Sequence, residues 1–270
     1  MIPFAKGHGL GNDYIVIDGA HLSSPLTAKQ TVRICDRNWG VGSDGILLKV
    51  PAWAGGDFGL RIFAKYLWEH DHTKEPVFTV DTKGGRVQCH CHVVDGRMNL
   101  VTVEMGSCTF LAPEIPMNGP AREVVRVPLQ VGTETLTVTA VSVGNPHCVV
   151  FVDKLDEERC KTLGPLLERH PAFPNRTNVQ FARVAGRSQV DILIWERGAG
   201  YTLASGSSSS AVACAAVKNG LCDHGLVTVR MPGGTLEIDV RPDWSIRLKG
   251  AVEEVYTGTF SRDLMDALAS

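Results

Sequence analysis

The stretch of residues 196–210 carries the side chains and backbone groups best suited to chemistry in this sequence. An expected strand delivers Glu196 and Arg197, a glycine-rich turn follows, and Ser205-Gly206-Ser207 opens a helix. Free N–H groups and the positive dipole end at a helix start favour a carboxylate or another anion, and the central glycine lets backbone approach a ligand closely. A flexible Gly/Ser linker is the alternative, but a small-residue helix suited to burial continues at once over 211–217.

Three asparagines stand where a loop meets an expected strand, namely Asn12, Asn145 and Asn178. Each could donate to a ligand carboxylate or accept from an amine, and each could equally be a turn former. His147 follows Asn145-Pro146, where it could support a site from behind or serve a turn or the packing.

Two further segments resemble ligand motifs but have the wrong geometry. The glycines of 7–12 lack the Gly-x-Gly-x-x-Gly spacing and precede a strand instead of a helix, which excludes a dinucleotide loop. Cys89-His90-Cys91-His92 lies in an expected strand, so its cysteines face one side and its histidines the other. Four ligands on opposite faces cannot close one tetrahedral site, and we therefore expect no metal.

Composition narrows the class of protein. The chain has 270 residues, a net charge of −2 and 44% hydrophobic residues, which is typical of a globular protein long enough for two domains. Without a basic cluster, neither a nucleic-acid nor a membrane partner is expected. The first six residues lack the apolar core of a signal peptide, and the eight scattered cysteines read as reduced thiols. These features predict a cytoplasmic protein.

Short strands bounded by Gly, Asp and Pro dominate the pattern. Among them are Tyr14–Asp18, Val77–Asp81, Arg86–Val94, Leu100–Glu104, Glu134–Val143, Cys148–Asp153, Asp191–Trp195, Val227–Arg230 and Leu236–Val240. Asp95-Gly96 predicts a tight hairpin turn. Helices are expected from a Ser24 N-cap to about Arg37, over Arg61–His70, over Leu155–Glu168, and from Ser207 to Lys218. The fold class is therefore α/β and strand-rich.

The two halves of the chain repeat one plan. Gly11-Asn12 precedes a strand and then a helix early in the first half, as Gly144-Asn145 does in the second. Late in each half, a strand, a double glycine and another strand follow one another. Short glycine-punctuated strands could resemble one another by chance, but four features in one order favour duplication. Two similar halves create a cleft, where ligands commonly bind.

The repeat also exposes a deficit in the first half. Trp195, at the end of an expected strand, and Gly233 stand 38 positions apart, whereas Phe63 and Gly84 stand 21 apart. If Phe63 ends the matching strand, 17 residues are missing after it, although residues 59–63 can also be read as the start of a helix. The missing stretch is the counterpart of the loop that carries Glu196 and Ser205.

Taken together, these segments resemble the diaminopimelate epimerases, a family of cofactor-independent amino-acid racemases and epimerases. The matching segments cover nearly the whole length in the family's order: His8-Gly9-Leu10-Gly11-Asn12-Asp13, Gly40-Val41-Gly42-Ser43-Asp44-Gly45, Met105-Gly106, Gly144-Asn145-Pro146-His147, Asn178, Glu196-Arg197-Gly198-Ala199-Gly200, Ala204-Ser205-Gly206-Ser207 and Pro232-Gly233-Gly234. No segment is specific alone, but their combination is.

The resemblance implies two pseudosymmetric domains, each with strands wrapped around a central helix, and an amino-acid substrate between them. We expect a first half over 1–115, a second over 116–252, and a strand and tail over 253–270 that pack back on the first. Substrate-binding positions map onto Asn12, Asn145, Asn178, Glu196, Arg197, Gly206 and Ser207, with His147 and Tyr201 behind them. No cofactor is implied, and a homodimer is the one assembly considered.

Two departures from the family concern its acid/base groups. Inversion at Cα requires two groups on opposite faces of the substrate, which the family supplies as a thiolate and a thiol. Ser205 stands at the second cysteine position, and the first cysteine would lie in the missing loop. Tyr201 replaces an acidic residue. The resemblance predicts interconversion of LL- and meso-diaminopimelate for lysine biosynthesis. The alternatives are an amino-acid-binding pseudoenzyme and an isomerase of another small acid with Glu196 or Tyr201 as proton carrier.

Overall fold

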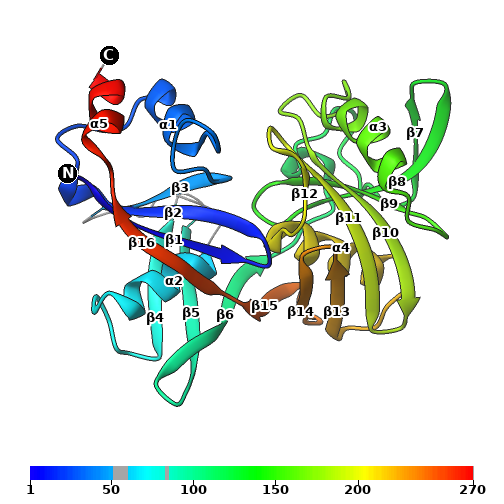
Figure 1. Cartoon of the computed structure of the whole chain (residues 1–270). Coiled ribbons are helices and arrows are strands. Elements are labelled where there is room, and N and C mark those ends of the chain that lie inside the picture. Colours follow the sequence, from blue (N-terminus) through cyan, green and yellow to red (C-terminus); the bar gives the residue numbers. More distant parts are fainter. Residues whose placement is uncertain (51–59, 83–84, 270) are drawn as a thin grey trace. The chain divides into compact units, whose positions relative to one another are not determined.

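The computed structural model describes residues 1–50, 60–82 and 85–269, and these form two compact units (Figure 1). One unit comprises residues 1–103 and 250–270, and the other comprises residues 104–249. From the sequence, we expected the first half to end at residue 115 and the second half to end at residue 252. The described helices include none that is long and apolar enough to cross a membrane.

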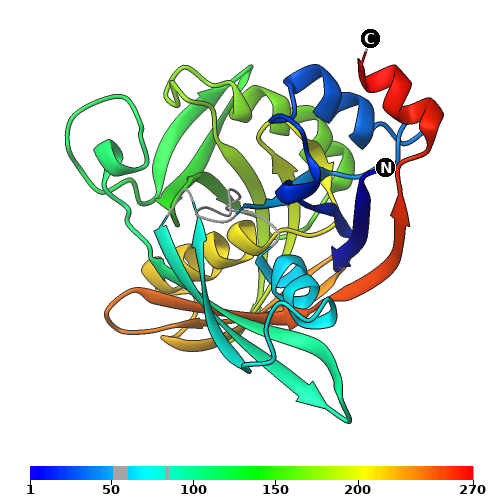
Figure 2. The ribbon, with the colours of Figure 1, turned by 90° about the vertical axis from the view of Figure 1, so that its left-hand side faces the viewer.

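The described part of the first unit contains a mixed sheet, an antiparallel strand group, three α-helices and a short 3-10 helix. The sheet has the order β16-β1-β2-β3, and the strands β4, β5 and β6 pair in sequence. Helices α1 and α5 lie side by side in both views (Figure 1 and Figure 2), where Gln30 donates to the Leu268 carbonyl. The elements are β1 (Pro3–Gly9), β2 (Asn12–Asp18), η1 (Gly19–His21), α1 (Ala28–Cys35), β3 (Gly45–Lys49), α2 (Leu60–Glu69), β4 (Val77–Thr82), β5 (Gly85–Val94), β6 (Arg97–Ser107), β16 (Glu253–Thr259) and α5 (Arg262–Ala269).

The second unit wraps a sheet around one helix. Its strands follow the order β15-β14-β13-β11-β10-β9-β8-β7, with β12 paired to β11. The elements are η2 (Ala112–Glu114), β7 (Val127–Val131), β8 (Glu134–Ser142), β9 (Pro146–Phe151), α3 (Glu157–Glu168), β10 (Asn178–Gly186), β11 (Gln189–Glu196), β12 (Gly200–Thr202), α4 (Gly206–Lys218), β13 (Gly225–Met231), β14 (Gly234–Val240) and β15 (Ser245–Ala251).

Helix α4 is the centre of the second unit because its surface is small or apolar on every side. Every residue of 207–217 is buried, and the helix contacts β8, β9, β10, β11, β13 and β14. A separate core cluster fills the space between α3 and the opposite face of the strands, with Phe181, Leu163 and Val138 among its members. The strand-rich α/β class is confirmed.

The two units repeat one order of elements and one register. In the first, β2 and β3 run parallel and pair Tyr14 with Gly45, and α1 connects them. In the second, β9 and β10 run parallel and pair His147 with Asn178, and α3 connects them. Tyr14 and His147 each stand two positions after the asparagine of a Gly-Asn pair. The order and the register therefore support the duplication.

This register corrects the position of the deficit. Of the two interpretations of this stretch, the strand end at Phe63 is wrong, because Phe63 lies inside α2, and the missing residues do not follow it. The helix expected over Arg61–His70 is confirmed. Gly45 precedes Leu60, the first described residue of α2, by 15 positions, whereas its equivalent Asn178 precedes the start of α4 at Gly206 by 28. The shortfall of 13 residues falls before α2, in a stretch whose residues 51–59 lie outside the described part of the chain.

Three local predictions can be checked directly. The expected Ser24 N-cap is wrong, because α1 begins after Thr27, whose side chain accepts from the Gln30 amide in a capping box. The Asp95-Gly96 turn is confirmed, since both residues have positive φ between the paired strands β5 and β6. The glycine-rich segment before Asn12 is a two-residue hairpin between antiparallel β1 and β2, as expected for a segment that is not a dinucleotide loop.

Candidate active site

The start of α4 presents two backbone donors that have no acceptor among the described residues. Ser205 is the N-cap, and its Oγ accepts from the Ser208 amide at 3.4 Å. The Ser205 carbonyl accepts from the Ser209 amide at 3.1 Å, which begins the regular helical bonding. The amides of Gly206 and Ser207 lie between these bonds and remain for a ligand. Such a helix start suits a carboxylate.

A buried hydrogen-bond chain joins this helix start to the Gly-Asn loop before β9. Gln180 Nε2 lies 3.0 Å from Ser208 Oγ and 3.0 Å from His147 Nδ1, and His147 Nε2 lies 3.0 Å from Asn145 Oδ1. Burial lowers the pKa of His147 to about 3. The imidazole is therefore neutral at physiological pH. Asn145 is also buried, and its Nδ2 has no partner among the described residues.

Asn178 holds two backbone segments together. Its Oδ1 accepts from the Arg197 amide at 2.9 Å, and its Nδ2 donates to the Pro146 carbonyl at 3.0 Å. Both ends of the amide are therefore used within the protein. The Arg197 side chain is exposed and donates to the Asn175 carbonyl at 3.0 Å.

Glu168, at the end of α3, fixes the turn after β11. Its carboxylate accepts from Trp195 Nε1 at 2.9 Å and from the Gly198 amide at 3.1 Å, and only 3% of the residue is exposed. The turn that follows Glu196 is thus anchored on both sides, by Glu168 and by Asn178. Rigid anchoring of this kind is what a precise binding geometry requires.

Tyr201 faces α3. Its ring packs against the core cluster beside that helix, and the Lys161 ammonium lies 5.2 Å from the ring centroid. Burial raises the pKa of Tyr201, and the charge of Glu157 raises it further. Glu196 is half-buried at the end of β11 and pairs with Gly200 across the turn.

Asn12 belongs to the first unit, where it begins β2 beside a charged cluster. Arg37 Nη2 and Lys6 Nζ each lie 2.8 Å from the carboxylate of Asp13, and Arg37 also pairs with Asp44 at 2.7 Å. Burial opposes ionisation of Asp13, but hydrogen bonds from Arg37 and Lys6 lower its pKa to about 2. Asp13 is therefore ionised next to Asn12, with its charge balanced by the cations of Arg37 and Lys6.

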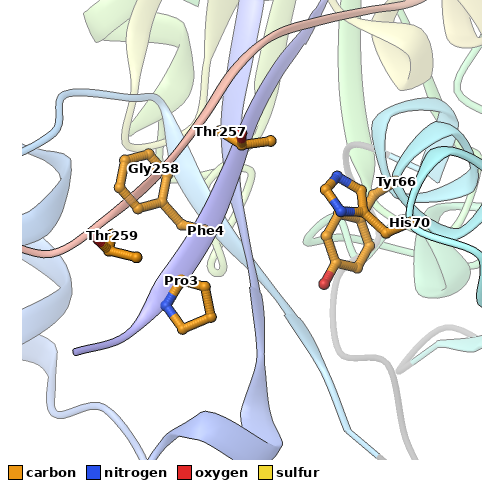
Figure 3. A pocket seen from close by; sticks show the side chains of 7 residues that line it. All are labelled: Pro3, Phe4, Tyr66, His70, Thr257, Gly258 and Thr259. Carbon is orange, nitrogen blue, oxygen red and sulfur yellow. The ribbon is translucent and has the colours of Figure 1, made fainter.

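The first unit also contains a pocket of about 360 Å³ (Figure 3). Tyr66 and His70 of α2 line one side, and residues of β1 and β16 line the other, namely Pro3, Phe4, Thr257, Gly258 and Thr259. His70 Nε2 lies 2.8 Å from a carboxylate oxygen of Glu254. None of the site residues expected from the sequence lines this pocket.

The cysteines lie elsewhere than at the start of α4. Cys89 and Cys91 are buried, whereas His92 is exposed, so the two residue types face opposite sides of β5. Burial raises the pKa of Cys89 to about 12 and that of Cys91 to about 11, which makes them poor nucleophiles. Cys214, on α4, is fully buried two turns beyond the N-cap.

Within the second unit, the contacts bring together Asn145, His147, Asn178, the Arg197 turn and the start of α4. Sequence reasoning missed two residues that hold this arrangement. Gln180 could have been found, because residues two apart on a strand share a face and Asn178 was already a candidate. Glu168 could not, since nothing in the sequence relates the end of a helix to a distant turn.

Comparison with known proteins identifies the family. The profile of the family described as diaminopimelate epimerase matches residues 4–111 and 139–259. Diaminopimelate epimerase 2 of Nostoc sp. is 42% identical over 278 positions, covering 97% of this chain and 96% of the relative. Diaminopimelate epimerase of Pelotomaculum thermopropionicum is 39% identical over 276 positions, covering 95% and 98%.

Two solved structures share the fold at low sequence identity. A probable proline racemase from Agrobacterium radiobacter has a TM-score of 0.71 at 15% identity and covers 100% of this chain and 95% of its own. A hydroxyproline epimerase from Agrobacterium vitis has a TM-score of 0.70 at 13% identity, with coverages of 96% and 90%.

The sequence relatives also bear on the deficit. The Nostoc alignment runs over 278 positions, although 97% of the 270 residues of this chain is about 262. About 16 aligned positions therefore have no residue in this chain, which agrees with a missing segment. From the matched profile and these relatives, the chain belongs to the diaminopimelate epimerase family.

Proposed function

We propose that this protein is an isomerase that interconverts LL- and meso-diaminopimelate in lysine biosynthesis, without pyridoxal phosphate. The observation that carries the proposal is the start of α4, where the amides of Gly206 and Ser207 are uncommitted among the described residues. The buried Asn145, whose Nδ2 has no partner among the described residues, belongs to the same hydrogen-bonded frame. Family membership supplies the substrate class.

In this proposal the substrate α-carboxylate accepts from the two amides of α4. Removal of the Cα proton places negative charge on that carboxylate, and the fixed donors and helix dipole stabilise the charge as it develops. Ser205 lies beside these amides and is the proton-carrying group that the second unit offers. The opposite face of Cα requires a second group, which the family takes from its first half.

A binding protein without turnover is the second candidate function. The Ser205 hydroxyl contacts Ser207 Oγ at 3.5 Å and accepts from the Ser208 amide, and neither group is a base that could activate it. A third candidate is an isomerase of another small acid with Glu196 as proton carrier. Tyr201 is the other residue considered as proton carrier. Its ring packs against α3 and burial raises its pKa, which weakens the hypothesis that Tyr201 carries the proton.

Proton NMR of the purified protein with LL-diaminopimelate in deuterium oxide tests these candidates. Loss of the Cα signal with growth of the meso isomer is the expected result for the epimerase. Exchange at Cα without inversion would indicate one-base chemistry. Line broadening of the ligand without exchange would establish a binding protein. If the spectra showed no exchange at Cα and no broadening of the ligand signals, the assignment of diaminopimelate as the ligand would be overturned.

Location and assembly complete the proposal. We infer a cytoplasmic protein, because lysine biosynthesis draws on cytoplasmic metabolites, with a small amino acid as its partner and no role for nucleic acid or membrane. The balanced net charge of −2 supports this choice of partner. A homodimer is the assembly to examine, and light scattering on the purified protein measures it.

A further inference from the structure

Gln180 connects the candidate site to the core of the second unit, although the mechanism above gives it no part. Gln180 is fully buried on β10, two positions from Asn178. One amide nitrogen reaches both Ser208 Oγ on α4 and His147 Nδ1 on β9. Gln180 thus lies between the helix start that would hold a carboxylate and the loop that carries Asn145.

The protonation of His147 follows from this contact. A neutral imidazole has one N–H donor and one acceptor nitrogen. In the structure the Gln180 nitrogen faces His147 Nδ1, while Gln180 Oε1 has no partner among the described residues. In this orientation of the amide His147 Nδ1 accepts, and the proton is therefore on Nε2. That N–H then donates to Asn145 Oδ1, at 3.0 Å. His147 has no free lone pair with which to act as a base.

The orientation of Asn145 follows in turn. Its oxygen accepts from the His147 N–H, so its nitrogen is the end of the amide that has no partner in the described part of the chain. We propose that Gln180 is a positioning residue that acts through His147 to make Asn145 a hydrogen-bond donor toward the ligand. This inference rests on the proposed function, because it assumes that a ligand binds at Asn145. It adds that the ligand atom there is a hydrogen-bond acceptor, such as a carboxylate oxygen.

The Gln180→Glu variant reverses the chain with a nearly isosteric side chain. An ionised carboxylate only accepts, so His147 would carry its proton on Nδ1 and leave Nε2 as an acceptor. Asn145 would then turn its nitrogen toward His147 and present its oxygen to the ligand. The Gln180→Met variant is the matched control, because it removes the hydrogen bonds without imposing either direction.

The tautomer can be measured without any ligand. Protein labelled with ¹⁵N-histidine gives two-bond ¹H–¹⁵N correlations that distinguish the two tautomers, and loss of one pattern in His147→Asn assigns the residue. We expect the Nε2–H form in the parent and the Nδ1–H form in Gln180→Glu at pH 8. The Nδ1–H form in the parent, or an unchanged tautomer in the variant, would overturn the inference.

Binding of LL-diaminopimelate, followed by NMR titration, tests the consequence at Asn145. Loss of one hydrogen bond to a charged group predicts about tenfold to a hundredfold weaker binding by Gln180→Glu. In an Asn145→Ala background, the same change should weaken binding less than about threefold, because no amide is left to reorient. Equal weakening in both backgrounds would mean simple charge repulsion and would refute the inference.

The two proposals fail separately. If the parent shows the Nε2–H tautomer but does not bind LL-diaminopimelate, the proposed substrate is wrong while the control of Asn145 by Gln180 stands. If the parent binds but shows the Nδ1–H tautomer, the substrate stands and the positioning role is refuted.

Discussion

Two buried polar side chains, Glu168 and Asn178, hold the candidate site of the second unit in shape, and both ends of each are hydrogen-bonded within the protein. Glu168 offers two carboxylate oxygens to two N–H donors, Trp195 Nε1 and the Gly198 amide. Asn178 likewise accepts at one end of its amide and donates at the other. Because a buried donor without an acceptor is expensive, such matched groups make the geometry sensitive to single atoms.

The Glu168→Gln variant changes one of these atoms. The new NH₂ group would face one of the two N–H donors, so one buried donor loses its acceptor. We expect the free energy of unfolding to fall by about 1–3 kcal/mol. Urea unfolding followed by tryptophan fluorescence measures this, since Trp195 is itself one of the partners.

Glu158→Gln is the matched control, because that side chain lies on the same helix and is 86% exposed. Its effect should stay within about 0.5 kcal/mol. If the two variants proved equally stable, Glu168 would not be the anchor of the turn after β11.

At the scale of elements, the sequence predicts which segments form helices better than where they start. Ser24-Pro25 has the residue types of a helix start, but the Thr27 side chain and Gln30 satisfy each other's backbone amides, and the helix begins there. Both signals are local and lie three residues apart. Only the reciprocal pair of hydrogen bonds decides between them, and this pair requires the folded backbone.

The Thr27→Ala variant removes this cap. We expect a loss of about 1 kcal/mol in the free energy of unfolding, the usual effect of an N-cap threonine. The control is Ser24→Ala, which removes the cap expected from the sequence and should change stability by less than about 0.5 kcal/mol. Denaturant titration of both variants gives the comparison. A larger loss at Ser24 would restore the earlier helix start.

The start of α4 shows the opposite case, where the sequence was sufficient. Ser205 was expected to open a helix, and it is the observed N-cap. Gln180, by contrast, gives its role only through distances to His147 and Ser208, which no local pattern contains.

At the scale of the whole molecule, the repeat predicted the deficit but not its position. The motif Leu60–Phe63 can end a strand or begin a helix, because its apolar residues fit either period. The choice is settled because Phe63 lies inside α2. The parallel pairing of Tyr14 with Gly45 then aligns β2 and β3 with β9 and β10 of the second unit. The residues that the first unit lacks would lie between β3 and α2.

This position determines how activity could be raised. Inversion at Cα needs one acid/base group from each half, and a serine hydroxyl is a far weaker acid than a thiol. Restoring, before Leu60, a first-half loop that carries a cysteine would supply the first group. Ser205→Cys would supply the second at the start of α4, where the helix dipole lowers the pKa of a thiol.

We expect the combined variant to gain epimerase activity by at least about tenfold, because only it has both groups and two-base chemistry fails when either is absent. The insertion alone and Ser205→Cys alone are the controls, and each should stay near the activity of the parent. Deuterium incorporation at Cα with formation of the meso isomer measures all four proteins under one protocol. A combined variant that folds, binds LL-diaminopimelate and yet shows no gain would mean that the lost thiols do not limit this protein.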